Sequence, residues 1–221
     1  NSSRPKWPNT WRTMRRRSPA GLRGNAADTF ASATWRWRAS KEKKGKPSHV
    51  FCQRLSSRIR AAYDNPEERT RHSEEYAYYP TEWRAPYIDR RRKVGWALYS
   101  LLGIDKGDKT RMHAQHRRNY DFFDAPVGLI FTIDRVLRQG SWLDYGMFLQ
   151  SFMVAAHARG LGTCPQAAFT QFHRIIERHL GLSEAQMVVC GMSLGHPDPA
   201  AVENTLRTER EPVARFARFV E

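Results

Sequence analysis

Two segments near the C-terminus have residue types and spacings that could hold an electron-rich or anionic ligand. The first, residues 160–169, places two glycines and a proline between two expected helices, so backbone amides at the start of the second helix are free to donate hydrogen bonds. The second, residues 204–212, contains Arg207 and Arg210, and two guanidinium groups at this spacing can converge on a phosphate. The alternatives are an ordinary helix–helix turn and two exposed arginines that pair with neighbouring glutamates.

The histidines and the known catalytic motifs give weaker evidence for a functional site than these two segments do. His113 and His116 share one face of an expected helix, but no carboxylate or cysteine accompanies them, which makes a weak metal site. His173 and His179 alternate with arginines, a pattern typical of a solvated helix face. The dinucleotide-binding glycine fingerprint, the P-loop, the nucleophile elbow and the paired-histidine zinc motif are all missing from the sequence. We therefore predict no metal site.

The elements expected from residue 51 onward are several helices, then a strand, two helices and a second strand. Two continuous apolar runs, 125–133 and 186–194, predict strands buried on both faces. Between them, Ser141 is the expected N-cap of a helix that ends at Gly160 or Gly162, and a second helix is expected over 167–180. Further helices are expected over residues 54–63, from Pro66, over 87–102 and over 109–118, with an irregular connection at 76–87. Helix outweighs strand, so the fold class is α+β or α/β, and we expect α+β with a small central sheet flanked by helices.

Charge divides the chain of 221 residues, whose formal net charge is +15. Residues 1–50 carry 13 Lys or Arg and two acids, whereas residues 51–221 are close to balanced. We therefore predict a basic N-terminal segment, 1–50, and one folded domain, 51–221. The segment, which also contains four tryptophans, could bind nucleic acid, but clustered like charge is more typical of a solvated tail, so we do not favour a nucleic-acid partner.

Cysteine content and hydropathy indicate the cellular context. Three widely spaced cysteines fit neither a disulfide framework nor a zinc pattern, and they suit a reducing compartment such as the cytoplasm. No run of about 18 apolar residues occurs in the sequence, so we expect no contact with a membrane.

Four stretches of the C-terminal half resemble one known family. They are Phe122–Val127, Ser141–Met147, Ala155–Thr163 and Gly191–Asp198, in an order that runs from helix through a Gly-Leu-Gly turn, a proline, a helix and a strand to an arginine-containing tail. On these residues the chain is identified as a member of the FMN-dependent nitroreductase family, over about residues 53–221. The stretch from Tyr76 to Asp121 is similar to the branch that reduces nitrobenzoate-like aromatics.

This resemblance implies a nitroreductase-like fold and a homodimer that binds FMN. NAD(P)H would reduce the flavin, and the flavin would then reduce a nitroaromatic or quinone-like acceptor in a ping-pong hydride mechanism. By position, Pro165, Gln166, Ala167 and Ala168 would lie beside the isoalloxazine ring, with a backbone amide near its N5 edge. The resemblance also implies that Arg207 and Arg210 grip the FMN phosphate and that no catalytic acid or base is required of a side chain.

The first 50 residues depart from the family pattern. Arg16, Arg17 and Ser18 are the one match to the family's N-terminal flavin-binding segment, and its second such segment has no counterpart here. Two alternatives therefore stay open beside the oxidoreductase. One is an inactive relic of the family without cofactor, and the other is a nucleic-acid-binding arm at the N-terminus.

Overall fold

The computed structural model describes residues 47–220, and their side chains from Cys52 onward. Its helices are α1 (Pro47–Asp64), α2 (Pro66–Thr70), α3 (Tyr87–Leu101), α4 (Lys109–Arg117), α5 (Gln139–His157), α6 (His173–Leu180) and α7 (Val213–Phe216). Three 3₁₀ segments are η2 (Arg118–Asp124), η3 (Ala167–Phe172) and η4 (Val202–Thr205), and the strands are β1 (Val127–Asp134), β2 (Gly162–Gln166) and β3 (Gln186–Gly195). The expected α+β class is confirmed. The expected basic segment lies almost entirely outside the described residues.

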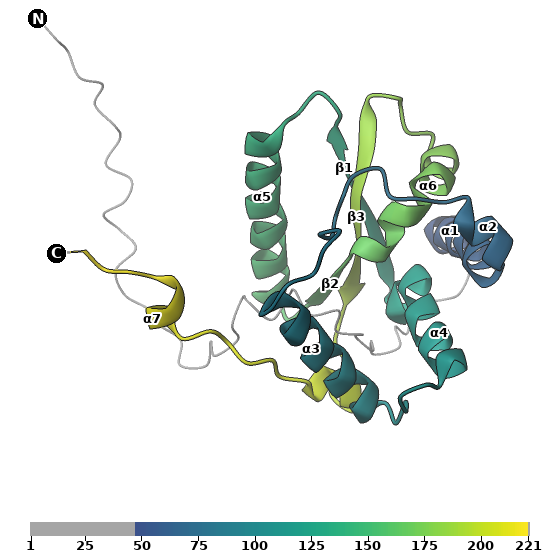
Figure 1. Ribbon diagram of the computed structural model, residues 1–221. Coiled ribbons are helices and arrows are strands. Elements are labelled where there is room, and N and C mark those ends of the chain that lie inside the picture. Colours follow the sequence, from purple (N-terminus) through teal and green to yellow (C-terminus); the bar gives the residue numbers. More distant parts are fainter. Residues whose placement is uncertain (1–46, 221) are drawn as a thin grey trace, which may run out of the picture.

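The three strands form one antiparallel sheet in the order β1-β3-β2. Among the described residues, β3 is therefore the central strand, and β1 and β2 each pair with it alone. The register places Val127 of β1 opposite Leu194, and Gln166 at the end of β2 opposite Gly191. Helix α5 covers one face of the sheet, while α1 and α6 lie on the other (Figure 1).

Two hydrophobic cores fill the two faces. The larger core joins α1, η2, η3 and α6 to the sheet, and its fully buried members include Ile59, Tyr120 and Phe172. The smaller core packs Trp142, Tyr145 and Leu149 of α5 on Ile133, Val189 and Cys190. The register between β1 and β3 shifts after Phe131, and this bulge lets the consecutive residues Val189 and Cys190 both contribute to the α5 side.

Local sequence explains several features of the helices. The side chain of Asn65 accepts hydrogen bonds from the amides of Glu67 and Glu68 and so caps α2. Helix α6 ends where Gly181 adopts a left-handed conformation, φ 65°, as expected for a C-terminal glycine. Leu55, Ile59 and Ala62 lie buried on one face of α1, which confirms the predicted spacing.

Four expectations about these elements were wrong. The 125–133 strand is not buried on both faces, because β1 is an edge strand and most of its residues are half-buried. Ser141 does not begin its helix: α5 starts at Gln139 after Arg138, which makes no side-chain cap. The turn expected between two helices contains β2, so residues 160–169 pass through the sheet. The helix expected over 167–180 is divided into η3 and α6.

Candidate active site

The end of β2 brings four of the predicted site residues together. Pro165 and Gln166 are the last residues of the strand, and Ala167 and Ala168 begin η3 directly after it. Because β2 is an edge strand, the missing amide hydrogen of Pro165 does not interrupt the sheet. Pro165, Ala167 and Ala168 are half-buried, whereas Gln166 is buried. Small side chains therefore leave the backbone at this junction accessible to a ligand.

The amides at this junction are suited to an electron-rich acceptor. The first N–H groups of a helix have no carbonyl partner within that helix. In the described chain Gln166 precedes η3 without capping it through its side chain. The amides of Ala167 and Ala168 are thus uncapped, and they can donate to a polar atom of a bound ring.

The side chain of Gln166 serves the fold rather than a ligand. Its Nε2 donates to the backbone oxygen of Asn119 at 2.8 Å, and its Oε1 accepts from the hydroxyl of Ser193 at 2.7 Å. That hydroxyl also lies 2.8 Å from the backbone oxygen of Phe122, so two acceptors share one proton. This buried network fixes β2 to β3 and η2. Ser193 and Asn119 were missed in the sequence, although a serine inside an apolar strand signals a buried hydroxyl that needs a partner.

The network holds a strained corner of the backbone. Phe122, Phe123 and Asp124 follow one another with φ of 51°, 52° and 64°. A left-handed conformation costs a residue with a side chain roughly 1–2 kcal/mol, so surrounding contacts must stabilise it. Phe123 packs on Cys164 of β2, which links the corner to the strand that carries the predicted ring contacts.

Two stacked rings fill the space between the corner and the sheet. Phe122 and Phe169 lie with centroids 4.6 Å apart and planes 26° from parallel. A Cβ built on Gly128 would lie 2.6 Å from the Phe122 ring, and one built on Gly191 would lie 2.3 Å from the Phe169 ring. Glycine is therefore required at these two strand positions so that the rings can approach the backbone.

The two arginines expected at a phosphate, Arg207 and Arg210, are exposed side chains of the C-terminal segment. Arg207 is bonded to the backbone oxygens of Asn204 and Leu206, and Arg210 to the hydroxyl of Thr208. No carboxylate among the described residues pairs with Arg207. Within the described residues, no hydrogen bond joins Arg207 to the 165–168 segment. Arg16, Arg17 and Ser18 lie outside the described residues.

His113 and His116 share one face of α4, as expected, because both rings stack on Tyr63. His113 contacts Asp64 at 3.0 Å and stacks on Tyr63. Burial, followed by the charges of His113 and Arg69, lowers the pKa of His116. Neither histidine belongs to a possible ligand cluster in the part of the chain that the structure describes.

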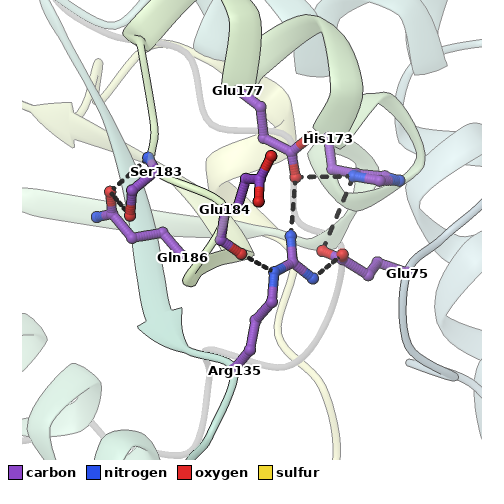
Figure 2. Close-up of polar contacts among 7 residues, drawn as sticks. All are labelled: Glu75, Arg135, His173, Glu177, Ser183, Glu184 and Gln186. Atoms are coloured by element: carbon purple, nitrogen blue, oxygen red, sulfur yellow. Dashed lines mark hydrogen bonds and ion pairs between the residues drawn. The ribbon is translucent and has the colours of Figure 1, made fainter.

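His173 is buried, so the solvated face expected for it was wrong. It lies 3.0 Å from Glu177 and 3.8 Å from Glu75, and these three residues could in principle surround a cation (Figure 2). The guanidinium of Arg135 already lies between the two carboxylates and contacts both. Its Nε also donates to the backbone oxygen of Glu184 at 2.6 Å. Arg135 thus supplies the positive charge that a metal would bring, and the cluster ties β1 to α6.

Two further features concern the cysteines and the lengths of the helices. None of the three cysteines, all of which lie in the described chain, forms a disulfide. Within residues 47–220 no helix is long and apolar enough to cross a membrane.

The family model described as "Nitroreductase family" matches residues 25–196, so the match begins inside the basic segment. A 4-nitrobenzoate reductase from Pseudomonas putida is 43% identical over 168 residues, which make up 76% of this chain and 72% of that protein. A nitrobenzene nitroreductase from Ectopseudomonas oleovorans is 41% identical over 146 residues, 66% of this chain and 64% of that protein. The chain thus spans between 64% and 72% of the length of these relatives.

The fold is also found among solved structures. An FMN and NADPH-dependent nitroreductase from Sphigopyxis sp. strain HMH superposes with a TM-score of 0.68 at 27% sequence identity. The superposition covers 89% of this chain and 99% of that chain.

Proposed function

The chain belongs to the nitroreductase family, and we propose that it is an FMN-dependent oxidoreductase that uses NAD(P)H to reduce nitroaromatic or quinone-like acceptors. The observation that carries this proposal is the junction of β2 and η3, where small residues present uncapped backbone amides. The matched relatives are a 4-nitrobenzoate reductase and a nitrobenzene nitroreductase, and the superposed structure is FMN and NADPH-dependent.

The residues at the junction fit a flavin ring. Pro165, Ala167 and Ala168 offer a low, half-buried surface, and the Gln166 side chain is turned into the protein, where it cannot obstruct a ring. When bound, FMN supplies the hydride chemistry. The part of this chain is to hold the ring and to direct an amide at its polar edge, where a donor stabilises negative charge.

The phosphate of FMN has a matching candidate in the C-terminal segment. Arg207 is exposed, and its guanidinium is bonded to neutral backbone oxygens rather than to a carboxylate, so its charge is available to an anion. We assign Arg210 to the same phosphate, together with Arg16, Arg17 and Ser18 from the N-terminal segment. Acceptor and nicotinamide would use the same face of the site in turn, so we expect ping-pong kinetics.

We propose that the protein is a homodimer. Exposed apolar side chains gather on the outer face of α5, at Leu143, Met147, Phe148 and Val154, and at the C-terminus, where Phe216 and Phe219 are 69% and 84% exposed. Helix α7 stands apart from the helices around the sheet (Figure 1). Apolar surface of this extent is typical of a protein interface, and a second copy of the chain would cover it.

The dimer is tested by the oligomeric state. The double variant Leu143→Asp, Phe148→Asp should run as a monomer in sedimentation velocity, because two charges in an apolar interface oppose association. Glu184→Lys is the control, since it changes charge away from this face. The cellular location that we propose is the cytoplasm, where thiols stay reduced.

The flavin spectrum tests the proposed activity most directly. The purified chain is incubated with FMN, desalted, and its visible absorbance is compared with its protein content. We expect a flavin band close to one per chain, and oxidation of NADPH or NADH only when a nitroaromatic acceptor is present. A folded protein with a flat spectrum would contradict the proposal and would favour the cofactor-free relic.

A further inference from the structure

A group of aromatic side chains, two of them exposed, lies in the connection between α2 and α3. We call Tyr76, Tyr78, Tyr79 and Trp83 the aromatic shelf. Successive rings of the shelf lie 6.3, 4.7 and 5.8 Å apart between centroids. Tyr78 and Tyr79 are 38% and 48% exposed, although burial of aromatic rings is strongly favourable. The shelf therefore offers unused apolar surface that a planar ligand could cover.

The shelf is anchored to the sheet rather than loosely attached. The hydroxyl of Tyr76 donates to the backbone oxygen of Val189 on β3 at 2.5 Å, and the Tyr76 ring packs on Trp142 of α5 at 4.8 Å. Just before the shelf, Glu74 accepts a hydrogen bond from Thr170 of η3 at 3.3 Å. Its position is thus fixed by β3, the strand that pairs with β2, and by η3, which carries two of the proposed flavin contacts.

These anchors place the shelf beside the proposed ring site. Gly191, two residues after Val189, pairs with Gln166 at the end of β2. Burial, followed by the neighbouring Tyr79 and Cys190, raises the pKa of Tyr78 to about 12, so its hydroxyl stays neutral and can donate. A ligand on the shelf would therefore lie next to the junction that holds residues 165–168.

One cation on the shelf has no carboxylate partner. The guanidinium of Arg91 lies over the Trp83 ring at 4.6 Å and over the Tyr79 ring at 5.3 Å. Its neighbours on α3 are different, because Arg90 and Lys93 pair with glutamates of the C-terminal segment at 2.6 and 2.8 Å. No carboxylate among residues 47–220 lies within ion-pair distance of Arg91. The aromatic rings hold this guanidinium in place while its N–H donors remain available.

We propose that Arg91 and the aromatic shelf form the acceptor subsite, and that Arg91 selects aromatic carboxylates. A benzoate-type ring would stack on Tyr79 or Tyr78, and its carboxylate would take up the charge-assisted bonds that Arg91 leaves open. The substrate class that follows is a nitroaromatic acid rather than a neutral nitroarene. This inference rests on the proposed function for its chemistry, and on the shelf for its geometry.

The kinetic test compares one acceptor that has a carboxylate with one that lacks it. With FMN-loaded protein, Arg91→Gln should raise the KM for 4-nitrobenzoate by about ten- to a hundredfold, the range of a lost charge-assisted bond. The kcat for 4-nitrobenzoate and both constants for nitrobenzene should stay near wild type. Arg91→Lys should restore part of the KM, because it keeps the charge but not the planar fork. Arg92→Gln, which removes the next exposed cation of α3, is the matched control.

A binding measurement decides the inference independently of turnover. Benzoate is titrated into wild type and Arg91→Gln, and quenching of tryptophan fluorescence is followed, with toluene as the neutral probe. Weaker benzoate binding by the variant, with unchanged toluene binding, supports the subsite. This holds even if no acceptor is reduced, because that result would contradict the proposed activity and not the subsite. Equal benzoate affinity and equal KM in wild type and Arg91→Gln would overturn the inference and leave Arg91 as a surface contact of the shelf.

Discussion

A methyl group at Gly191 should destabilise the protein because no space exists for it. A Cβ at this position would lie 2.3 Å from a carbon of the Phe169 ring, whereas non-bonded carbons prefer about 3.5–4.0 Å. The ring would have to retreat by more than ~1 Å. Phe169 is fully buried and stacked on Phe122, so it cannot move without displacing that neighbour and the strained corner beyond it.

The expected cost of Gly191→Ala is about 2–3 kcal/mol, the upper part of the range for overpacked cores. For a chain of this length that corresponds to a Tm lower by roughly 4–12 °C. Urea unfolding followed by circular dichroism, at one fixed protein concentration because association would contribute to stability, measures the change. Gly95→Ala is the control, since a Cβ on this α3 residue meets nothing within 4 Å and alanine favours a helix.

A double-mutant cycle isolates the clash itself. In a Phe169→Leu background the ring is gone, so adding Gly191→Ala should cost clearly less than it does in wild type. Equal cost in the two backgrounds, or a Gly191→Ala protein as stable as wild type, would refute the reasoning and would mean that the strand can shift to admit the methyl group.

Three further outcomes are expected. Ser193→Ala should lower the free energy of unfolding by about 1–3 kcal/mol in urea, because it leaves the buried oxygen of the Gln166 side chain without its donor. The control Ser151→Ala removes an exposed hydroxyl and should change the free energy of unfolding little. The His116 ring lies against Tyr63 and Tyr120, and its desolvation there, followed by the charges of His113 and Arg69, lowers its pKa from the ordinary 6.5. The unfolded chain is therefore protonated first as pH falls below 6.5, and this residue makes stability decline toward pH 5. His116→Gln should flatten that decline in urea midpoints. Burial raises the pKa of the Cys164 thiol, so mass spectrometry should find it unmodified by iodoacetamide in native protein and alkylated in urea; labelling of the native state would contradict this.

Element types were predictable where one local pattern decided them. Helix α3 and its end at Gly103 follow from the apolar spacing and a glycine, and the structure shows that glycine at φ 63°. The central strand β3 is a continuous apolar run, and it is buried as expected. In both cases the side chains that fix the structure are neighbours in sequence.

The candidate site was predictable as a segment but not as a structure. Gly162–Gln166 reads as a turn because glycine and proline are poor strand formers, and it becomes a strand only because β3, far along the chain, offers it a partner. The resemblance identified Gln166, yet its inward side chain depends on Ser193 and Asn119. Among the described residues Arg91 has no carboxylate partner, whereas its neighbours Arg90 and Lys93 pair with glutamates of the C-terminal segment, and no local pattern predicts which of them is paired.

The strand order has a consequence for synthesis of the chain on the ribosome. β1 is complete at Asp134, but its one partner, β3, ends at Gly195, about 60 residues later. At roughly 5–20 residues per second, translation needs about 3–12 s to cover that interval. During this interval β1 and the apolar helix that follows it lack their partner strand. β2 also lacks that partner from its own completion at Gln166. The nascent β1–α5 segment therefore exposes apolar surface that a chaperone could bind, and slow codons between residues 134 and 195 would prolong this exposure.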